Sequence, residues 1–324
     1  MPSPTSTELR PLGTPPEAVA GDLDRVSSFD RVLIVSLPRS GTSTYRTLLS
    51  ELFGLQPVLA ACETDPSCWP DPPKWKPYER DGTIAALRAG QVACVHGEPS
   101  ELWLEQLAES PRTLVIHAYR DIRDAALSAT RYIRHRPAHL CARTLGRLHF
   151  EESLACVITG CRIPYDDQPA HLQARNPNRL ALEFGGYDEL GACSAAWAAM
   201  PNVAQLRYES IFHDADGARH LSGALHRVGV ALTLDHAAAG IERVSFERLT
   251  GRRPGERKPG EHLERGLADA WNQEPLSLTV RILAQRVLGD WLERFGYPAD
   301  TLEPREPEAA EGSDASSVSN NVSM

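Results

Sequence analysis

The sequence predicts an α/β fold in which helices flank a parallel β-sheet. Four short apolar runs, each typical of a buried strand, occupy residues 32–37, 92–95, 113–118 and 203–206. Apolar residues at helical spacing follow the first, third and fourth runs. Strands that alternate with helices in this way pair in parallel through right-handed crossovers. A chain of 324 residues, 42% of them hydrophobic, is long enough to bury one large core of this kind.

The chain is expected to form a single domain over residues 29–300. Residues 1–28 and 301–324 are rich in Pro, Ser and acidic residues, a composition that favours flexible ends. Within the domain, residues 135–200 contain four prolines that interrupt helical periodicity. We therefore expect an irregular insertion or cap there, facing the substrate.

Charge and cysteine content exclude several classes of protein. The formal net charge is -9, from 34 Lys and Arg against 43 Asp and Glu, so the overall field repels nucleic acid. An anionic ligand must then be held by a local cluster of donors. Seven cysteines without a tight framework favour reduced thiols. Because there is no apolar stretch of about eighteen residues and no leader-like start, we expect a cytoplasmic protein without membrane association.

The loop between the first predicted strand and its helix is a candidate anion site. Residues 38–43 read Pro-Arg-Ser-Gly-Thr-Ser, and a helix start exposes N–H groups that bind anions. For this loop alone, an ordinary capped turn is the favoured alternative. A triphosphate-binding loop, G-x-x-x-x-G-K-[ST], would need Gly at Ser36 and Lys at Thr42. Arg39 instead supplies the charge of this P-loop-type element.

Polar residues also follow the other predicted strands. His96 follows the second strand, Arg120 the third, and Tyr208 the fourth. Ligands of parallel sheets bind beyond the carboxyl ends of the strands, so these side chains are candidates for one site. Near the C-terminus, Val280, Leu283 and Val287 begin the apolar stripe of a long helix, which we interpret as core packing.

Several segments resemble the cytosolic-type sulfotransferases that use 3′-phosphoadenosine 5′-phosphosulfate (PAPS). The loop and its flanks, VLIVSLPRSGTSTYRTLL, look like the 5′-phosphosulfate loop of that family. The third strand and its helix, TLVIHAYRDIRDAALSATRY, resemble the 3′-phosphate element. Further resemblances, in the order of the family, are QVACVHGEP, NVAQLRYES, VSFERLTG and HLERGLADAW. Together they cover roughly residues 30–135 and 200–297.

The resemblance implies a role for each matching residue. Arg39 with Ser40, Gly41, Thr42 and Ser43 would hold the 5′-phosphosulfate; Arg120, Ser128, Arg265 and Gly266 the 3′-phosphate; and Tyr208 and Phe246 the adenine. His96 would be the general base that deprotonates an acceptor hydroxyl, because imidazole titrates near neutrality. Glu98 is a second candidate base. PAPS would be the co-substrate, and the acceptor would be a small molecule or a glycan.

Three departures from the family pattern keep other readings open. Thr44 replaces a Trp that stacks on adenine, Cys94 replaces a Lys, and Glu264 replaces an Arg. A non-catalytic nucleotide-binding relative is therefore an alternative, and so is a P-loop kinase or NTPase, although that reading lacks its lysine. No metal is expected, since a set from His135, His139 and Cys141 fits no tetrahedral spacing. The sequence does not indicate the acceptor or the oligomeric state.

Overall fold

A parallel five-stranded sheet forms the centre of the protein. The computed structural model describes residues 29–58, 74–75, 83–137, 139–170, 173, 180–258 and 265–299, so Glu264 and both predicted flexible ends lie outside the described residues. The strands are β1 (Arg31–Ser36), β2 (Gln56–Pro57), β4 (Gln91–Val95), β5 (Thr113–Tyr119) and β8 (Val203–Arg207). Their order is β2-β4-β1-β5-β8, with every neighbouring pair parallel. The four predicted strands and their parallel pairing are confirmed.

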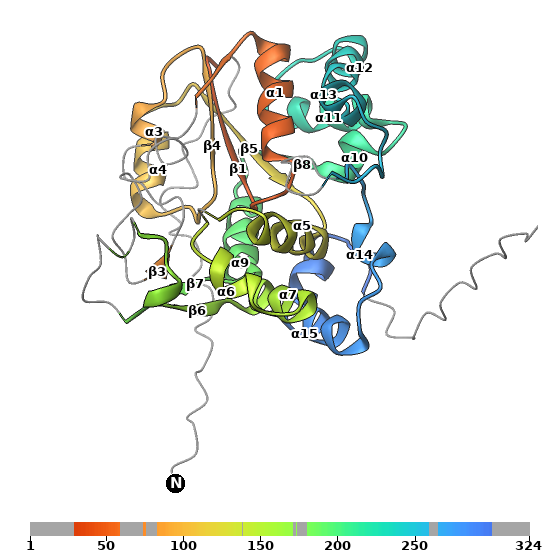
Figure 1. Cartoon of the computed structure of the whole chain (residues 1–324). Coiled ribbons are helices and arrows are strands. Elements are labelled where there is room, and N and C mark those ends of the chain that lie inside the picture. Colours follow the sequence, from red (N-terminus) through yellow and green to blue (C-terminus); the bar gives the residue numbers. More distant parts are fainter. Residues whose placement is uncertain are drawn as a thin grey trace, which may run out of the picture.

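Helices cover both faces of this sheet (Figure 1). Val32 and Ile34 face α1 (Thr42–Phe53), α11 (Gly217–Arg227) and α12 (Leu234–Arg243). Leu33 and Val35 face α3 (Thr83–Ala86), α4 (Glu101–Ala108) and Trp197 of α9 (Tyr187–Ala198). Because alternate side chains enter two different cores, each strand reads as a continuous apolar run.

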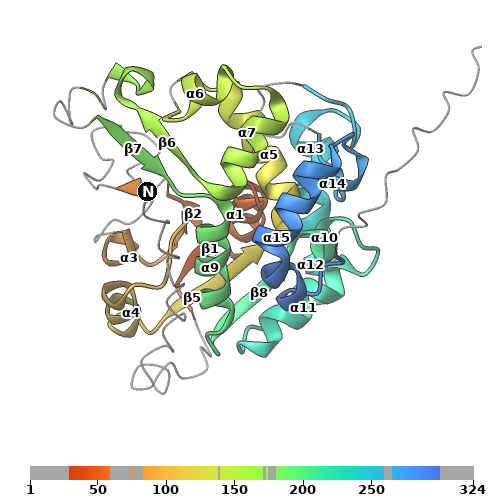
Figure 2. The same ribbon diagram turned by 90° about the horizontal axis from the view of Figure 1, so that it is seen from below.

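A third apolar core is built mainly from helices. Its members are α5 (Ile122–Arg134), α6 (Ala142–Gly146), α7 (Phe150–Thr159), α9, α14 (Ala270–Gln273) and α15 (Leu278–Arg294). We call these helices the helical layer. Figure 1 shows α5, α7, α9 and α15 gathered below the sheet, and Figure 2 shows α9 and α15 between α4 on one side and α11 on the other. A small second sheet, ordered β3-β7-β6, consists of β3 (Lys74–Trp75), β7 (Ala181–Phe184) and β6 (Cys161–Pro164).

Residues 135–200 differ from the predicted irregular cap. Their described part contains α6, α7, α9, β6 and β7, and three of these elements are helices of the helical layer. The described prolines lie at element boundaries: Pro137 follows α5, Pro164 ends β6, and Pro169 follows the 3₁₀ helix Tyr165–Asp167, while Pro177 lies outside the described residues. A proline that separates two elements breaks periodicity in the sequence without disordering either of them.

The predicted C-terminal helix and its core packing are confirmed as α15. Val280 is buried and Val287 packs against the core, while the buried face also includes Ala284 and Leu288, and Leu283 is half-buried. Two short helices, α10 (Tyr208–Phe212) and α13 (Phe246–Thr250), were not predicted, since each is barely longer than one turn. Of the helices in the described ranges, none combines the length and apolar character needed to cross a membrane.

Candidate functional site

The ends of β1, β4 and β5 meet at one edge of the sheet. β1 lies between β4 and β5, with Val35 opposite Val95 and Ser36 opposite Ala118. The loop after β1 is therefore flanked by His96 on one side and Arg120 on the other. This is a topological switch point, because the chain leaves β1 toward β2 and leaves the neighbouring β5 in the opposite direction, toward β8. Such points are the usual ligand sites of open α/β sheets.

The loop at residues 37–41 has the features of an anion site. Arg39 and Gly41 both have left-handed backbones, with φ of 67° and 83°. For a residue other than glycine this conformation costs on the order of 1 kcal/mol, and such strain often marks a functional site. Ser40 is fully buried, and its Oγ has no hydrogen-bond partner. A ligand oxygen accepting from this hydroxyl would remove an unsatisfied polar group.

Arg39 connects the loop to α5. Its Nε donates to Ser128 Oγ at 3.3 Å, and its guanidinium lies 4.6 Å from the ring centroid of Tyr132. Its backbone carbonyl accepts from Arg120 Nη1 at 3.4 Å. The structure thus brings together Arg39, Arg120 and Ser128, which the sequence analysis placed in two separate segments.

His96 is hydrogen-bonded to the strand that enters the loop. Its Nδ1 lies 2.6 Å from the Ser36 carbonyl oxygen and 3.2 Å from Ser36 Oγ, which is 2.8 Å from Thr42 Oγ1. Because a carbonyl can only accept, Nδ1 carries the hydrogen and Nε2 carries the lone pair. Burial lowers the pKa of His96 to about 4, opposed by the Ser36 carbonyl and aided by the charge of Arg39. The ring is therefore neutral at physiological pH, the form a general base requires.

The turn after His96 is held in place by α9. Trp197 Nε1 donates to the Gly97 carbonyl at 2.7 Å. Glu98, the second candidate base, is exposed in this turn, and its carbonyl accepts from the Ser100 amide at 2.9 Å. Of the two candidates, His96 is the one linked through Ser36 to the anion loop.

Arg120 is fixed by a buried carboxylate that the sequence analysis missed. Its Nη2 donates to Asp124 Oδ2 at 2.8 Å and to the Leu267 carbonyl at 3.2 Å. Asp124 is fully buried and also accepts from the amides of Ala270 and Trp271, at 3.2 and 2.6 Å. The available signal was the four-residue spacing of Arg120, which precedes the N-cap of α5, and Asp124, which lies in the first turn of that helix. Arg120 Nε is buried without a hydrogen-bond partner, so one donor is unused.

Asp121, the residue after Arg120, is used in holding the start of α5. Its side chain caps α5 by accepting from the Arg123 amide, and its carboxylate pairs with the Arg123 guanidinium at 2.7 Å. Glu209 accepts from the Asp121 amide at 2.9 Å.

Residues 265–269, which precede α14 and which we call the late loop, lie against Phe246. Gly266 has φ of 61°, and a Cβ at this position would lie 2.3 Å from the Phe246 ring, so only glycine fits. Arg265 Nη1 lies 3.5 Å from Glu274 Oε2, while Arg265 Nε is buried without a hydrogen-bond partner. Of the two matching residues of this loop, Gly266 therefore does lie against Phe246.

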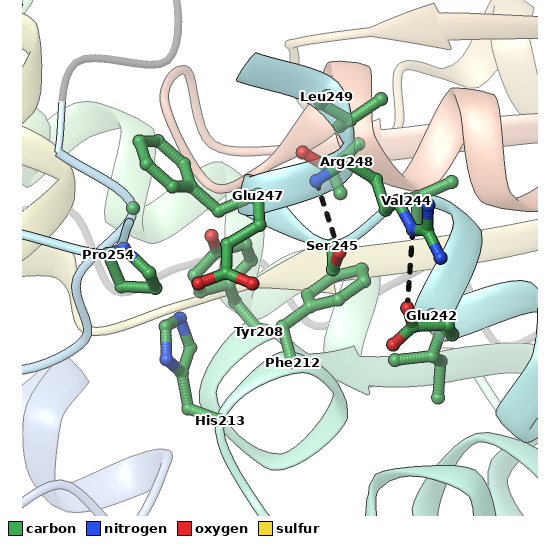
Figure 3. Close-up of a pocket in the computed structure, with 14 residues that line it drawn as sticks. Tyr208, Phe212, His213, Glu242, Val244, Ser245, Glu247, Arg248, Leu249 and Pro254 are labelled. Atoms are coloured by element: carbon green, nitrogen blue, oxygen red, sulfur yellow. Dashed lines mark hydrogen bonds and ion pairs between the residues drawn. The ribbon is translucent and has the colours of Figure 1, made fainter. Parts of the chain in front are cut away.

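A cavity of about 560 Å³ lies beside the anion loop (Figure 3). Its walls include Thr44, Tyr208, Phe246 and Gly266, three of them predicted nucleotide-site residues. The Tyr208 ring packs on Gly41, where an added Cβ would lie 2.5 Å from the ring, and the Arg120 guanidinium lies 5.0 Å from the ring centroid. The volume is in the range of small-molecule sites, and the aromatic walls suit a flat ring.

Other contributors gave no motif in the sequence. Tyr187, at the start of α9, donates from its hydroxyl to the Pro38 carbonyl of the anion loop at 2.7 Å. His117 is fully buried in β5, with Nδ1 2.6 Å from Gln205 Oε1 and Nε2 2.8 Å from Ser194 Oγ. Within the described ranges, no group of three His, Cys, Asp or Glu residues could hold a metal ion.

Comparison with known proteins supports one fold. No family model matches the sequence, and no curated protein matches it. Among solved structures, mouse sulfotransferase SULT7A1 complexed with PAP is similar over 83% of this chain and 87% of its own, with 12% identity and a TM-score of 0.53. Retinol dehydratase, in complex with androsterone and inactive cofactor PAP, is similar over 85% of each chain, with 17% identity and a TM-score of 0.50. The chain has the sulfotransferase fold. The predicted α/β architecture of the P-loop type is thereby confirmed.

Proposed function

We propose that this chain is a sulfotransferase that moves a sulfuryl group from PAPS to a hydroxyl, or less favourably an amine, of a small-molecule or glycan acceptor. The observation that carries the proposal is the link from neutral His96 through Ser36 to Thr42 of the anion loop, at 3.2 and 2.8 Å. It places a candidate base next to a candidate anion site. The two solved structures named above both hold PAP, the nucleotide that remains after PAPS gives up its sulfuryl group.

The unused donors of the site fit such a nucleotide. Ser40 Oγ, Arg120 Nε and Arg265 Nε are all buried without hydrogen-bond partners. Buried donors in this state cost about 1–3 kcal/mol each, which phosphate oxygens would recover. Ser40 would serve the 5′-phosphate with Thr42, and the two arginines the 3′-phosphate. The cavity bounded by Tyr208 and Phe246 would take the adenine.

Arg39 would stabilise charge during transfer. PAPS supplies an activated sulfuryl group, and its displacement resembles phosphoryl transfer, where positioning and charge neutralisation provide most of the catalysis. The Arg39 guanidinium and the backbone N–H groups at the start of α1 would donate hydrogen bonds to the sulfuryl oxygens, which gain negative charge during transfer. Ser128 on α5 accepts from Arg39 Nε at 3.3 Å, so it ties the guanidinium of the anion loop to the helix that follows Arg120.

His96 would remove the proton of the acceptor hydroxyl through Nε2. With a pKa of about 4, the ring is neutral but only weakly basic. An anionic group bound beside the ring favours its protonated form, so binding of PAPS would raise this pKa toward neutrality. The base would therefore become stronger when the co-substrate is in place.

A P-loop kinase or NTPase is the main rival reading. It would need a lysine where Thr42 stands and an Asp available for Mg²⁺. Asp121, the residue in the corresponding region, is used in capping α5 and pairing with Arg123. These contacts favour the sulfotransferase over the kinase.

Thermal unfolding with two ligands tests the proposal. Adenosine 3′,5′-bisphosphate should stabilise the protein, by about 2.7 kcal/mol at one hundred times its Kd, whereas ATP with Mg²⁺ should have a smaller effect. Stabilisation by ATP with Mg²⁺ alone would overturn the proposal. Transfer of labelled sulfate from PAPS to a panel of phenols and sugars then separates an enzyme from a non-catalytic relative, which binds the bisphosphate but transfers nothing.

A further inference from the structure

Three arginines occupy the C-terminal end of α5 and the turn after it, and two of them have structural roles. Arg131 forms an ion pair with Glu274. Arg134 Nη1 donates to the carbonyls of Leu145 and Leu148, at 2.8 and 2.7 Å. Arg136 is exposed, and it makes no ion pair with any residue in the described ranges. Its charge is thus available to a ligand.

The guanidinium of Arg136 lies on the same ring as that of Arg39. The two carbons Cζ are 5.0 and 4.6 Å from the ring centroid of Tyr132. Arg39 is close enough to His96 for its charge to lower the pKa of that ring. A line of side chains therefore runs from the candidate base through Arg39 and Tyr132 to Arg136.

A cation near a helix C-terminus is common, because the helix dipole favours it there. That explanation accounts for the position of Arg136 but not for its sharing a ring with Arg39. Both guanidinium groups lie within about 5 Å of one ring centroid, so their charges repel each other, and an anion beside Arg136 lowers that energy. In a chain with net charge -9, an exposed arginine without an ion pair in the described ranges is an attractive site for an anion.

We propose that Arg136 binds a carboxylate of the acceptor, so that the preferred acceptors are hydroxylated carboxylic acids. The inference rests on the proposed sulfotransferase function and names its substrate class. The acceptor hydroxyl would face His96 while its carboxylate reaches the outer guanidinium beside Tyr132. A planar guanidinium suits a carboxylate because it can donate two parallel hydrogen bonds.

Matched acceptor pairs test the proposal. The phenol pair is 4-hydroxyphenylacetate against its methyl ester, and the sugar pair is methyl glucuronide against methyl glucoside. Using both pairs shows whether the carboxylate comes from a small phenolic acid or from a glycan unit. The acid of at least one pair should have a KM about tenfold lower than its neutral partner. Arg136→Gln should remove that difference while leaving KM for the neutral partner unchanged. Arg219→Gln, which changes an exposed arginine on α11, is the matched control and should keep it.

Each outcome bears on one proposal. If neutral acceptors are turned over and the acids show no advantage, or if Arg136→Gln keeps the advantage, the carboxylate site is wrong while the sulfotransferase stands. If no acceptor is turned over, thermal shift in the presence of adenosine 3′,5′-bisphosphate still decides. The acid must then raise the unfolding temperature of the parent more than its neutral partner does. This difference between acid and neutral partner must be smaller in Arg136→Gln. Equal shifts would overturn the carboxylate site.

Discussion

The anion loop and the helical layer differ in how they use their buried polar groups. Around the loop, Ser40 Oγ and Arg120 Nε are buried without partners, and Arg39 has a left-handed backbone. In the helical layer, Asp124 accepts three hydrogen bonds. Ser194 of the layer also forms a hydrogen bond with His117 Nε2, and the other ring nitrogen of His117 bonds with Gln205. Although Trp291 Nε1 of the layer is also unpaired, Asp124 and Ser194 use their polar atoms to fix residues near the sheet edge. Under the proposed function, the unused donors around the loop serve a ligand instead.

If this division is correct, changes at the loop should reduce turnover without reducing stability. The largest expected effect is that of His96→Ala, which should lower kcat by about 10² to 10⁴-fold because proton removal is lost. Stabilisation by adenosine 3′,5′-bisphosphate should be retained. Labelled-sulfate transfer and thermal shift measure the two quantities. The control is Glu98→Gln; if it abolishes turnover while His96→Ala does not, the base is Glu98.

Asp124 belongs to both regions, so its loss should reduce both properties. Asp124→Asn removes the charge partner of Arg120 and weakens the bonds to Ala270 and Trp271. Breaking a buried ion pair typically costs about 3–5 kcal/mol, and a looser Arg120 should bind the bisphosphate more weakly. Urea unfolding measures the first effect. The control is Asp216→Asn, which changes an exposed carboxylate paired with Arg219. It should change the free energy of unfolding by less than about 1 kcal/mol.

His117 should make the fold sensitive to acid without contributing to chemistry. Burial lowers its pKa to about 4, below the ordinary value of 6.5, although Gln205 opposes the shift. The native state then binds fewer protons than the unfolded state, so stability that is complete above pH 6.5 is lost as the pH falls toward 4. At pH 5 the loss is on the order of 2 kcal/mol.

Urea unfolding of the parent and of His117→Gln at pH 8 and pH 5 measures this contribution. The variant should lose about 2 kcal/mol less than the parent between the two values. His96 and His139, whose pKa values burial also lowers to about 4, contribute equally to both proteins. An identical pH dependence in the two proteins would show that His117 is not the group responsible.

Tyr187→Phe should have the smallest effect. The substitution removes the hydroxyl that donates to the Pro38 carbonyl, at a cost of about 1 kcal/mol in stability. A loop with more freedom should also bind the bisphosphate a few-fold more weakly. Thermal shift with and without the ligand separates the two contributions. An unchanged affinity would indicate that the loop keeps its shape without the helical layer.

The division between the two regions also explains what could be predicted. The strands, the anion loop and the residues after the strands lie in contiguous segments, so hydrophobic runs and short motifs revealed them. Asp124 and Tyr187 act on residues far away in the chain, and their roles follow from packing that no local pattern encodes. In residues 135–200, prolines at element boundaries looked like breaks within elements. The cavity was predicted only through Tyr208, Phe246 and Gly266, since other wall residues, such as Phe212 and Ile241, belong to no motif.

The bond from the Trp271 amide to Asp124 joins residues 147 positions apart. During synthesis, a nascent chain that already contains the anion loop, His96 and Arg120 still lacks the segment that completes the site. Until residue 271 has left the ribosome, Arg120 has no late loop to hold, and a nucleotide would find only part of its binding surface. Ligand binding would then report that the chain is finished, and a truncated product would be left without that protection against proteolysis.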